Sequence, residues 1–260
     1  MSKFIDKLNQ ISQTGSQPMG FRAARSASQK LKMLLVASLT PADVDNLADY
    51  VAGADAGLVH ALQLGSRAGM LLKLSQAALA IPWGVWLKDV GQDDIKQIVE
   101  TGCDFVIFSA TDTPLALLQD DKVGKILEVA TSLSDGLLRT VNELSLDAVL
   151  IAAEQEGEYL LTWHHLMLFQ RFANLLTKPL LASVPPNVTA DELQALWKAG
   201  VGGVVIEAEA GQPVDRLKKL RQVIDKLAFP SQRKRGEAEA LLPHISRETR
   251  MVTTEEEEEE

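Results

Sequence analysis

Eight short runs of apolar residues, rich in β-branched side chains, recur through the chain and constrain its fold more than any other feature. Their first residues lie between 20 and 32 positions apart, so each interval has room for one strand, one helix and two short loops. Runs such as Phe105–Phe108 are apolar on both faces, as parallel strands covered on both sides are. The predicted strands are Leu34–Leu39, Ala56–Ala61, Trp83–Leu87, Cys103–Ser109, Gly124–Thr131, Asp147–Ala153, Pro179–Val184 and Gly202–Ala208.

Start and stop signals for helices fall between these runs. Thr40-Pro41 supplies an N-cap followed by proline at the first helical position. Thr189 and Glu192 have the spacing of a capping box, and the helix that they open ends at Gly200. Eight alternating strand–helix units predict an α/β protein with the (β/α)8 fold, the TIM barrel. A doubly wound open sheet is the alternative, although the glycine motifs of its nucleotide-binding forms are absent.

Two terminal segments flank the predicted barrel, which we place at residues 34–230. Residues 1–33 are predicted to form a helix with one apolar face, followed by a loop. The basic, serine-rich character of this segment also fits an organelle transit peptide. Residues 231–260 end in six consecutive glutamates. Because adjacent like charges repel and bury nothing, we predict a disordered acidic tail there.

Composition narrows the class of protein. The 260 residues are 46% apolar, which is enough for one large domain with a full core. The formal charge of −9 argues against a nucleic-acid-binding protein, and a single cysteine excludes a disulfide framework. No secretory signal opens the chain, and every apolar stretch of membrane-spanning length is broken by polar residues. We therefore expect a cytoplasmic protein that contacts neither nucleic acid nor membrane.

Polar residues at the carboxyl ends of the predicted strands form the candidate site, because (β/α)8 barrels build their active sites there. A charge in such a place needs a reason, since burying an unpaired charge is costly. For each charge the alternative is a surface loop or a structural ion pair, and for the histidine a simple hydrogen bond. No spacing of histidines or carboxylates indicates a metal site, and no cofactor is expected. The candidate catalytic residues are Lys88, Glu128, Glu154 and His60, and the candidate substrate-binding residues are Ser38, Ser109, Ser183 and Glu207.

Signals for phosphate binding are missing where this fold usually carries them. Many barrels hold phosphate with glycine-rich loops after the seventh and eighth strands. Here the seventh predicted strand runs into Pro185-Pro186, which removes two backbone donors, and the eighth runs into the acidic segment Glu207–Gly211. Both features disfavour a dianionic phosphate, and they count equally against a flavin-binding oxidoreductase. The predicted substrate is a small organic acid or carbonyl compound.

One part of the chain resembles a known group of enzymes. Residues 81–90 (IPWGVWLKDV) and 101–107 (TGCDFVI) are distantly similar to the third and fourth units of ribulose-phosphate-binding barrels, most of all indole-3-glycerol-phosphate synthase. The segment Ile126–Val129 (ILEV) is similar to that family's fifth strand. The resemblance implies that Lys88 is a general acid and Glu128 its catalytic partner. The family's phosphate-binding glycines have no counterpart here.

Two classes of function follow from these features. The first is an enzyme of lyase or isomerase type, with Lys88 as general acid and a glutamate as base. The second is a barrel without catalysis that serves as a binding or assembly subunit. The helix Leu161–Leu176 favours the second, because apolar residues surround it and an outer face with Trp163, Met167 and Phe169 suits a homo-oligomer. A wide barrel-facing stripe, covered in part by the N-terminal segment, explains the same pattern.

Overall fold

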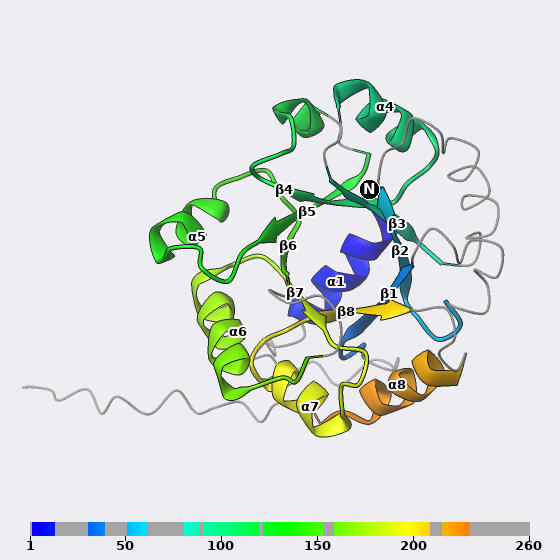
Figure 1. Ribbon diagram of the computed structural model, residues 1–260, viewed down its shortest axis with the longest axis vertical. Coiled ribbons are helices and arrows are strands. Elements are labelled where there is room, and N and C mark those ends of the chain that lie inside the picture. The colour runs from blue at the N-terminus through cyan, green and yellow to red at the C-terminus, as the bar shows by residue number, and fades with distance from the viewer. Residues whose placement is uncertain are drawn as a thin grey trace, which may run out of the picture. The chain divides into compact units, whose positions relative to one another are not determined.

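The strands of the chain close into a parallel barrel in which each strand pairs with its neighbours in sequence and β8 returns to β1. The computed structural model describes residues 2–13, 31–39, 51–61, 81–88, 91–119, 122–152, 159–208 and 215–228. Figure 1 shows the ring of strands with helices around its outside, which confirms the (β/α)8 fold. The strands are β1 Leu34–Leu39, β2 Ala56–Ala61, β3 Trp83–Leu87, β4 Phe105–Ser109, β5 Gly124–Val129, β6 Ala148–Ile151, β7 Leu180–Val184 and β8 Gly203–Ala208.

The described helices begin and end at the signals that the sequence carries. Thr189 and Glu192 form the expected capping box, with the Thr189 N–H donating to the Glu192 carboxylate at 2.8 Å. Gly102 and Gly200 follow two of the helices with φ of 81° and 99°, a region that favours glycine. The helix predicted after Thr40 lies outside the described residues. The helices are α1 Lys3–Gln13, α4 Gln92–Glu100, the 3-10 helix η3 Leu115–Gln119, α5 Asp135–Val141, α6 Trp163–Leu175, α7 Ala190–Lys198 and α8 Asp215–Lys226.

Helix α1 closes the amino-terminal mouth of the barrel, and Figure 1 shows it lying across the ring of strands. Phe4 and Leu8 are fully buried, and the ring of Phe4 stacks on that of Phe105 with centroids 4.5 Å apart. A Cβ at Gly124 would lie 2.5 Å from the Ile5 side chain, so glycine at the start of β5 lets the helix approach. These contacts lie at the starts of β4 and β5. The opposite end of the barrel is therefore where a site can open.

A carboxylate from the barrel caps the first turn of α1. Asp104, immediately before β4, accepts hydrogen bonds from the Ser2 hydroxyl at 2.7 Å and from the backbone N–H groups of Lys3 and Phe4 at 2.8 and 2.9 Å. The first N–H groups of a helix have no partner within it, and a negative charge at that end is favourable. This single side chain, about 100 residues away in sequence, fixes the position of α1.

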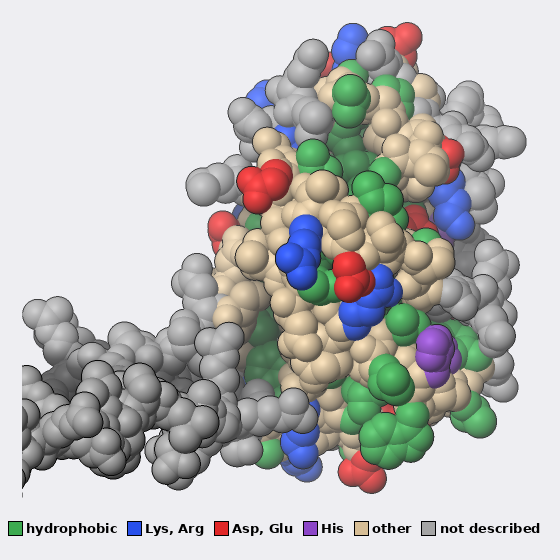
Figure 2. Space-filling view, turned by 90° about the vertical axis from the view of Figure 1, so that its left-hand side faces the viewer, with side chains coloured by type: hydrophobic (Ala, Val, Ile, Leu, Met, Phe, Trp, Pro, Cys, Tyr) green, Lys and Arg blue, Asp and Glu red, His purple; other side chains and the backbone are tan. Residues whose placement is uncertain are grey.

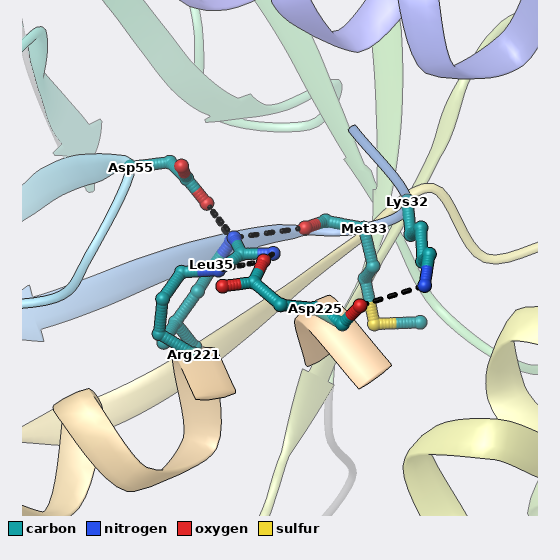
Figure 3. A network of polar contacts seen from close by, with 6 residues as sticks. All are labelled: Lys32, Met33, Leu35, Asp55, Arg221 and Asp225. Atoms are coloured by element: carbon teal, nitrogen blue, oxygen red, sulfur yellow. Dashed lines mark hydrogen bonds and ion pairs between the residues drawn. The ribbon is translucent and has the colours of Figure 1, made fainter. Parts of the chain in front are cut away.

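A second carboxylate ties α8 to the first two strands (Figure 3). Asp55, just before β2, accepts from the backbone N–H of Leu35 at 2.9 Å and pairs with Arg221 at 2.6 Å. Arg221 also donates to the Met33 carbonyl at 3.2 Å and pairs with Asp225 at 2.8 Å. Arg221 and Asp55 are mostly shielded from solvent, whereas Asp225 is half exposed, and the network ties the last described helix to β1. None of the helices in the described ranges has the length and apolar character that crossing a membrane requires.

Candidate active site

The register of the barrel places the polar strand-end residues on one face of the sheet, the inside. Paired residues of parallel strands point to the same face, and residues two apart on one strand share a face. Following the pairs around the ring therefore gives one continuous set of inward positions near the carboxyl ends. The register pairs are Ser38 with Glu207, His60 with Trp86, Ser109 with Glu128, Glu128 with Leu150, and Ser183 with Val205.

A cavity of about 100 Å³ opens at this end of the barrel, and six of the eight predicted site residues line it. Two predictions stand apart. Ser109 faces inward but is not part of the lining, because its hydroxyl bonds the Thr111 hydroxyl two residues along the chain at 2.8 Å. Glu154 lies outside the described residues. The predicted residues that line the cavity are Ser38, His60, Lys88, Glu128, Ser183 and Glu207, and Trp86, Tyr159, Pro185 and Pro186 join them.

Trp86 contacts three of the candidate catalytic residues. Its indole Nε1–H donates to Glu128 Oε2 at 2.7 Å, and its ring stacks on the His60 ring with centroids 4.8 Å apart at 30°. The Lys88 Nζ lies 5.7 Å from the centre of the same ring, within the range of a cation–π contact. Trp86 itself is buried, and Lys88 is exposed at the mouth. An ammonium group, a carboxylate and an imidazole are thus gathered around one aromatic side chain.

A buried hydroxyl orients the imidazole. Ser38 Oγ lies 2.8 Å from His60 Nε2, and Ser38 is almost fully buried at the end of β1. Which of the two atoms donates depends on the tautomer of the histidine. In either form the contact fixes the plane of the ring that stacks on Trp86. A histidine held in this way is suited to moving a proton between the serine hydroxyl and a bound molecule.

Tyr159 closes the side of the cavity next to β7. Its hydroxyl donates to the Ser183 carbonyl at 3.1 Å. Burial, and after it the negative charge of Glu207, raises the pKa of Tyr159 to about 12. The phenol is therefore neutral at physiological pH and presents a hydroxyl, not an anion, to the cavity. A smaller cavity of about 20 Å³, enough for a single water molecule, lies on its other side.

Replacing Tyr159 by phenylalanine is expected to remove a tyrosine ionisation near pH 12. An ordinary tyrosine ionises near pH 10, whereas Tyr159 retains its proton to about pH 12. Its contribution to stability is present below about pH 10 and is lost as pH rises through 12, because the unfolded chain releases the proton first. Ultraviolet absorbance of tyrosinate during an alkaline titration measures this late phase. A late phase that persists in Tyr159→Phe contradicts the assignment.

The neighbouring histidines of α6 have a structural partner. His165 Nδ1 accepts a hydrogen bond from the backbone N–H of Thr162 at 3.1 Å, which completes a capping box at the start of the helix. His164 and His165 have ring centroids 6.4 Å apart. Across the described ranges, no group of three or more histidine, cysteine or acidic residues is arranged to hold a metal ion. The only cysteine, Cys103, is buried two residues before β4, and burial raises the pKa of its thiol well above the usual range.

The described lining lacks a phosphate grip after β7. Pro185 and Pro186 are buried against the cavity and provide no N–H groups. The start of α7 is closed by its own capping box, in which the Glu192 N–H donates to the Thr189 hydroxyl and the Glu192 carboxylate accepts from the Thr189 N–H. The negative charge of Glu192 at this helix end further disfavours an anion. The segment after β8 lies outside the described residues.

Comparisons with known proteins bear on the fold alone. No protein family and no curated protein matches the chain. Among solved structures, the tryptophan synthase α-subunit of Pyrococcus furiosus superposes with a TM-score of 0.58 at 13% identity, over 75% of this chain and 97% of that chain. A ligand-free tryptophan synthase chain from M. tuberculosis gives a TM-score of 0.59 at 14% identity, over 86% and 98%. These likenesses agree with the (β/α)8 fold predicted from the sequence.

Proposed function

We propose that the chain is an enzyme of lyase or isomerase type that moves protons on a small organic acid or carbonyl compound. The observation that supports it most strongly is the meeting of Lys88, Glu128 and His60 around Trp86 in one cavity. Charged and titratable groups that converge in a concave site at the carboxyl ends of barrel strands are typical of catalytic machinery. The similarity of the fold to subunits of an enzyme agrees with this assignment.

The two charged residues have complementary roles in such a reaction. The Glu128 carboxylate accepts a proton from the carbon next to a substrate carbonyl. The C–H bonding electrons form a C=C bond, and the π electrons of the carbonyl move onto its oxygen. The Lys88 ammonium group stabilises or protonates that oxygen, giving an enediol or enol. From an enediol, the proton returns to the former carbonyl carbon while the other hydroxyl gives up its proton to His60, held by Ser38, which completes an isomerisation. In an elimination the carbonyl re-forms instead, and the group on the next carbon leaves with its bonding electrons.

The lining also selects the kind of substrate. Lys88 is the cationic side chain of the described lining, and Glu128 and Glu207 are its carboxylates. One cation is enough to pair with a monocarboxylate or a polarised carbonyl, whereas a phosphate dianion meets two carboxylates and a proline-lined wall. We therefore assign an unphosphorylated substrate with few heavy atoms, consistent with a cavity of about 100 Å³.

A ligand screen by thermal unfolding tests this assignment. Pyruvate, glycolaldehyde, 2-oxobutyrate and inorganic phosphate are added to the wild type, to Lys88→Ala and to Lys96→Ala, whose side chain is exposed on α4. A ligand at 100 times its Kd adds about 2.7 kcal/mol of stability, which raises Tm by roughly 5–10 °C in a domain of this size. We expect a carbonyl compound to shift the wild type and Lys96→Ala and to leave Lys88→Ala unmoved, with no shift from phosphate. A shift that Lys88→Ala retains contradicts the site.

Assembly with a second copy is the alternative function, and one observation favours it. Leu160, Trp163 and Met167 are 73%, 81% and 69% exposed, and Figure 2 shows hydrophobic side chains gathered on the side that carries α5 and α6. The exposed apolar face of α6 is smaller than the sequence predicts, because Phe169 lies on the buried side of the helix. Sedimentation equilibrium gives a molar mass of twice 28.3 kDa if this face pairs with itself, and Trp163→Ser then restores the monomer.

A further inference from the structure

We infer that Trp86 is the positioning residue of the acid–base site, and that its indole N–H leaves Glu128 Oε1 as the proton-accepting atom. The inference rests on the proposed function, because it concerns how the same cavity is organised. In the sequence, Trp86 has the pattern of a core residue in an apolar strand. Its contacts set it apart, since a single side chain reaches groups at the carboxyl ends of β2, β3 and β5.

The hydrogen bond to Glu128 spans the inside of the barrel. Trp86 pairs with Ile107 of β4, and Glu128 lies on β5, so the indole reaches past one whole strand to the carboxylate. The indole of tryptophan has one N–H group, which donates a hydrogen bond and cannot accept one. Here this N–H donates to Glu128 Oε2 at 2.7 Å. A donor at this distance stops the carboxylate from rotating. The second oxygen, Oε1, is then the one that faces a substrate proton.

The ring of Trp86 orders the other two groups. The stacking contact at 4.8 Å limits the imidazole of His60 to one plane, and the cation–π contact at 5.7 Å draws the long Lys88 side chain toward the cavity. Trp86 is only 8% exposed, so the ring itself has little freedom. Holding flexible groups in one geometry removes an entropic cost from the reaction.

Phenylalanine at position 86 separates the hydrogen bond to Glu128 from the ring contacts with His60 and Lys88. Trp86→Phe keeps an aromatic ring for His60 and Lys88 and removes only the donor to Glu128. We expect kcat/KM to fall about 10- to 100-fold, as for loss of a hydrogen bond to a charged group. The pH–rate profile is expected to change in Trp86→Phe, because this substitution removes a hydrogen bond to the proton-accepting carboxylate. Trp83→Phe is the matched control, since Trp83 is buried in the same strand and faces outward.

A measurement that needs no turnover tests the same contact. The full chain holds four tryptophans, so labelling them with 15N gives four indole N–H resonances, and Trp86→Phe identifies one of them. We expect that resonance to move when the pH is lowered in the wild type and not to move in Glu128→Gln, which keeps an acceptor for the indole without a charge. Comparison with Glu128→Gln also separates Glu128 from the other titratable groups of the lining, which are His60, Lys88, Tyr159 and Glu207.

Two results would overturn the inference. The first is a Trp86 resonance that changes neither with pH nor in Glu128→Gln. The second is a Trp86→Phe variant whose pH–rate profile matches that of Trp83→Phe. If Trp86→Phe does not fold, comparing the pH dependence of the indole resonances in the wild type and in Glu128→Gln still tests the contact between Trp86 and Glu128. If the Trp86 resonance responds to Glu128 but the protein turns over no carbonyl compound, the contact between Trp86 and Glu128 is supported and the proposed reaction is rejected.

Discussion

Replacing Phe105 by alanine is expected to lower the free energy of unfolding by about 3–5 kcal/mol, the cost of truncating a fully buried phenylalanine. The Phe105 ring fills the amino-terminal part of the barrel: it stacks on Phe4, and a Cβ at Gly84 would lie 2.3 Å from it. Alanine therefore leaves a cavity between β3, β4 and α1 that the surrounding strands cannot close. Chemical denaturation followed by circular dichroism measures the change, with Phe105→Leu as the graded control.

A double-mutant cycle with Phe4→Ala shows whether α1 accounts for part of this loss. The two rings contact each other, so truncating both is expected to cost less than the sum of the single losses, with a coupling of about 0.5–1.5 kcal/mol. Additive losses contradict the packing of α1 on the barrel. A loss below 1 kcal/mol in Phe105→Ala would contradict the burial of the ring itself.

Replacing Glu128 by glutamine is expected to reduce proton transfer by about 100- to 10,000-fold, the usual contribution of a general base. Glutamine keeps the shape of the side chain and an acceptor for the Trp86 indole, but it cannot take a proton. The rate is measured by nuclear magnetic resonance as exchange of the carbon-bound protons of a small carbonyl compound with deuterium from the solvent.

Two comparisons make the Glu128→Gln result specific. Glu143→Gln removes an exposed glutamate just beyond α5 and is expected to exchange at the wild-type rate. The ligand-dependent shift in Tm is expected to survive in Glu128→Gln, because Lys88 still binds the carbonyl compound. Exchange at an undiminished rate in Glu128→Gln would mean that another group is the base.

The barrel was predictable because its determinants are local and repeated. Apolar runs indicate the strands, and capping signals such as the box at Thr189 and Glu192 indicate where helices begin. The docking of α1 was not predictable in the same way. Its apolar face indicates that something covers it, but nothing local shows that Asp104 caps its first turn or that Phe4 stacks on Phe105. Such partners are set by closure of the barrel.

The candidate site was predictable in part, for a geometric reason. Side chains at the carboxyl ends of parallel strands meet at one rim, so a reading of strand ends finds Lys88, Glu128 and His60 together. Trp86 was missed because an aromatic residue in an apolar strand has the pattern of core. Its position two residues before Lys88, on the same face, was the available signal. Tyr159 lies in an irregular segment after β6, where no periodicity indicates which way a side chain points.

Solvent deuterium exchange by the wild-type protein tests the central claim most directly. Small 2-oxo acids and hydroxyaldehydes, each beside its phosphorylated counterpart, are incubated with the protein in D2O, and loss of carbon-bound proton signals is followed over time. We predict exchange above the protein-free rate for at least one unphosphorylated compound, absent in Lys88→Ala and Glu128→Gln and absent for its phosphorylated counterpart. Exchange of the phosphorylated compounds alone, or of none, would contradict an acid–base enzyme of this specificity.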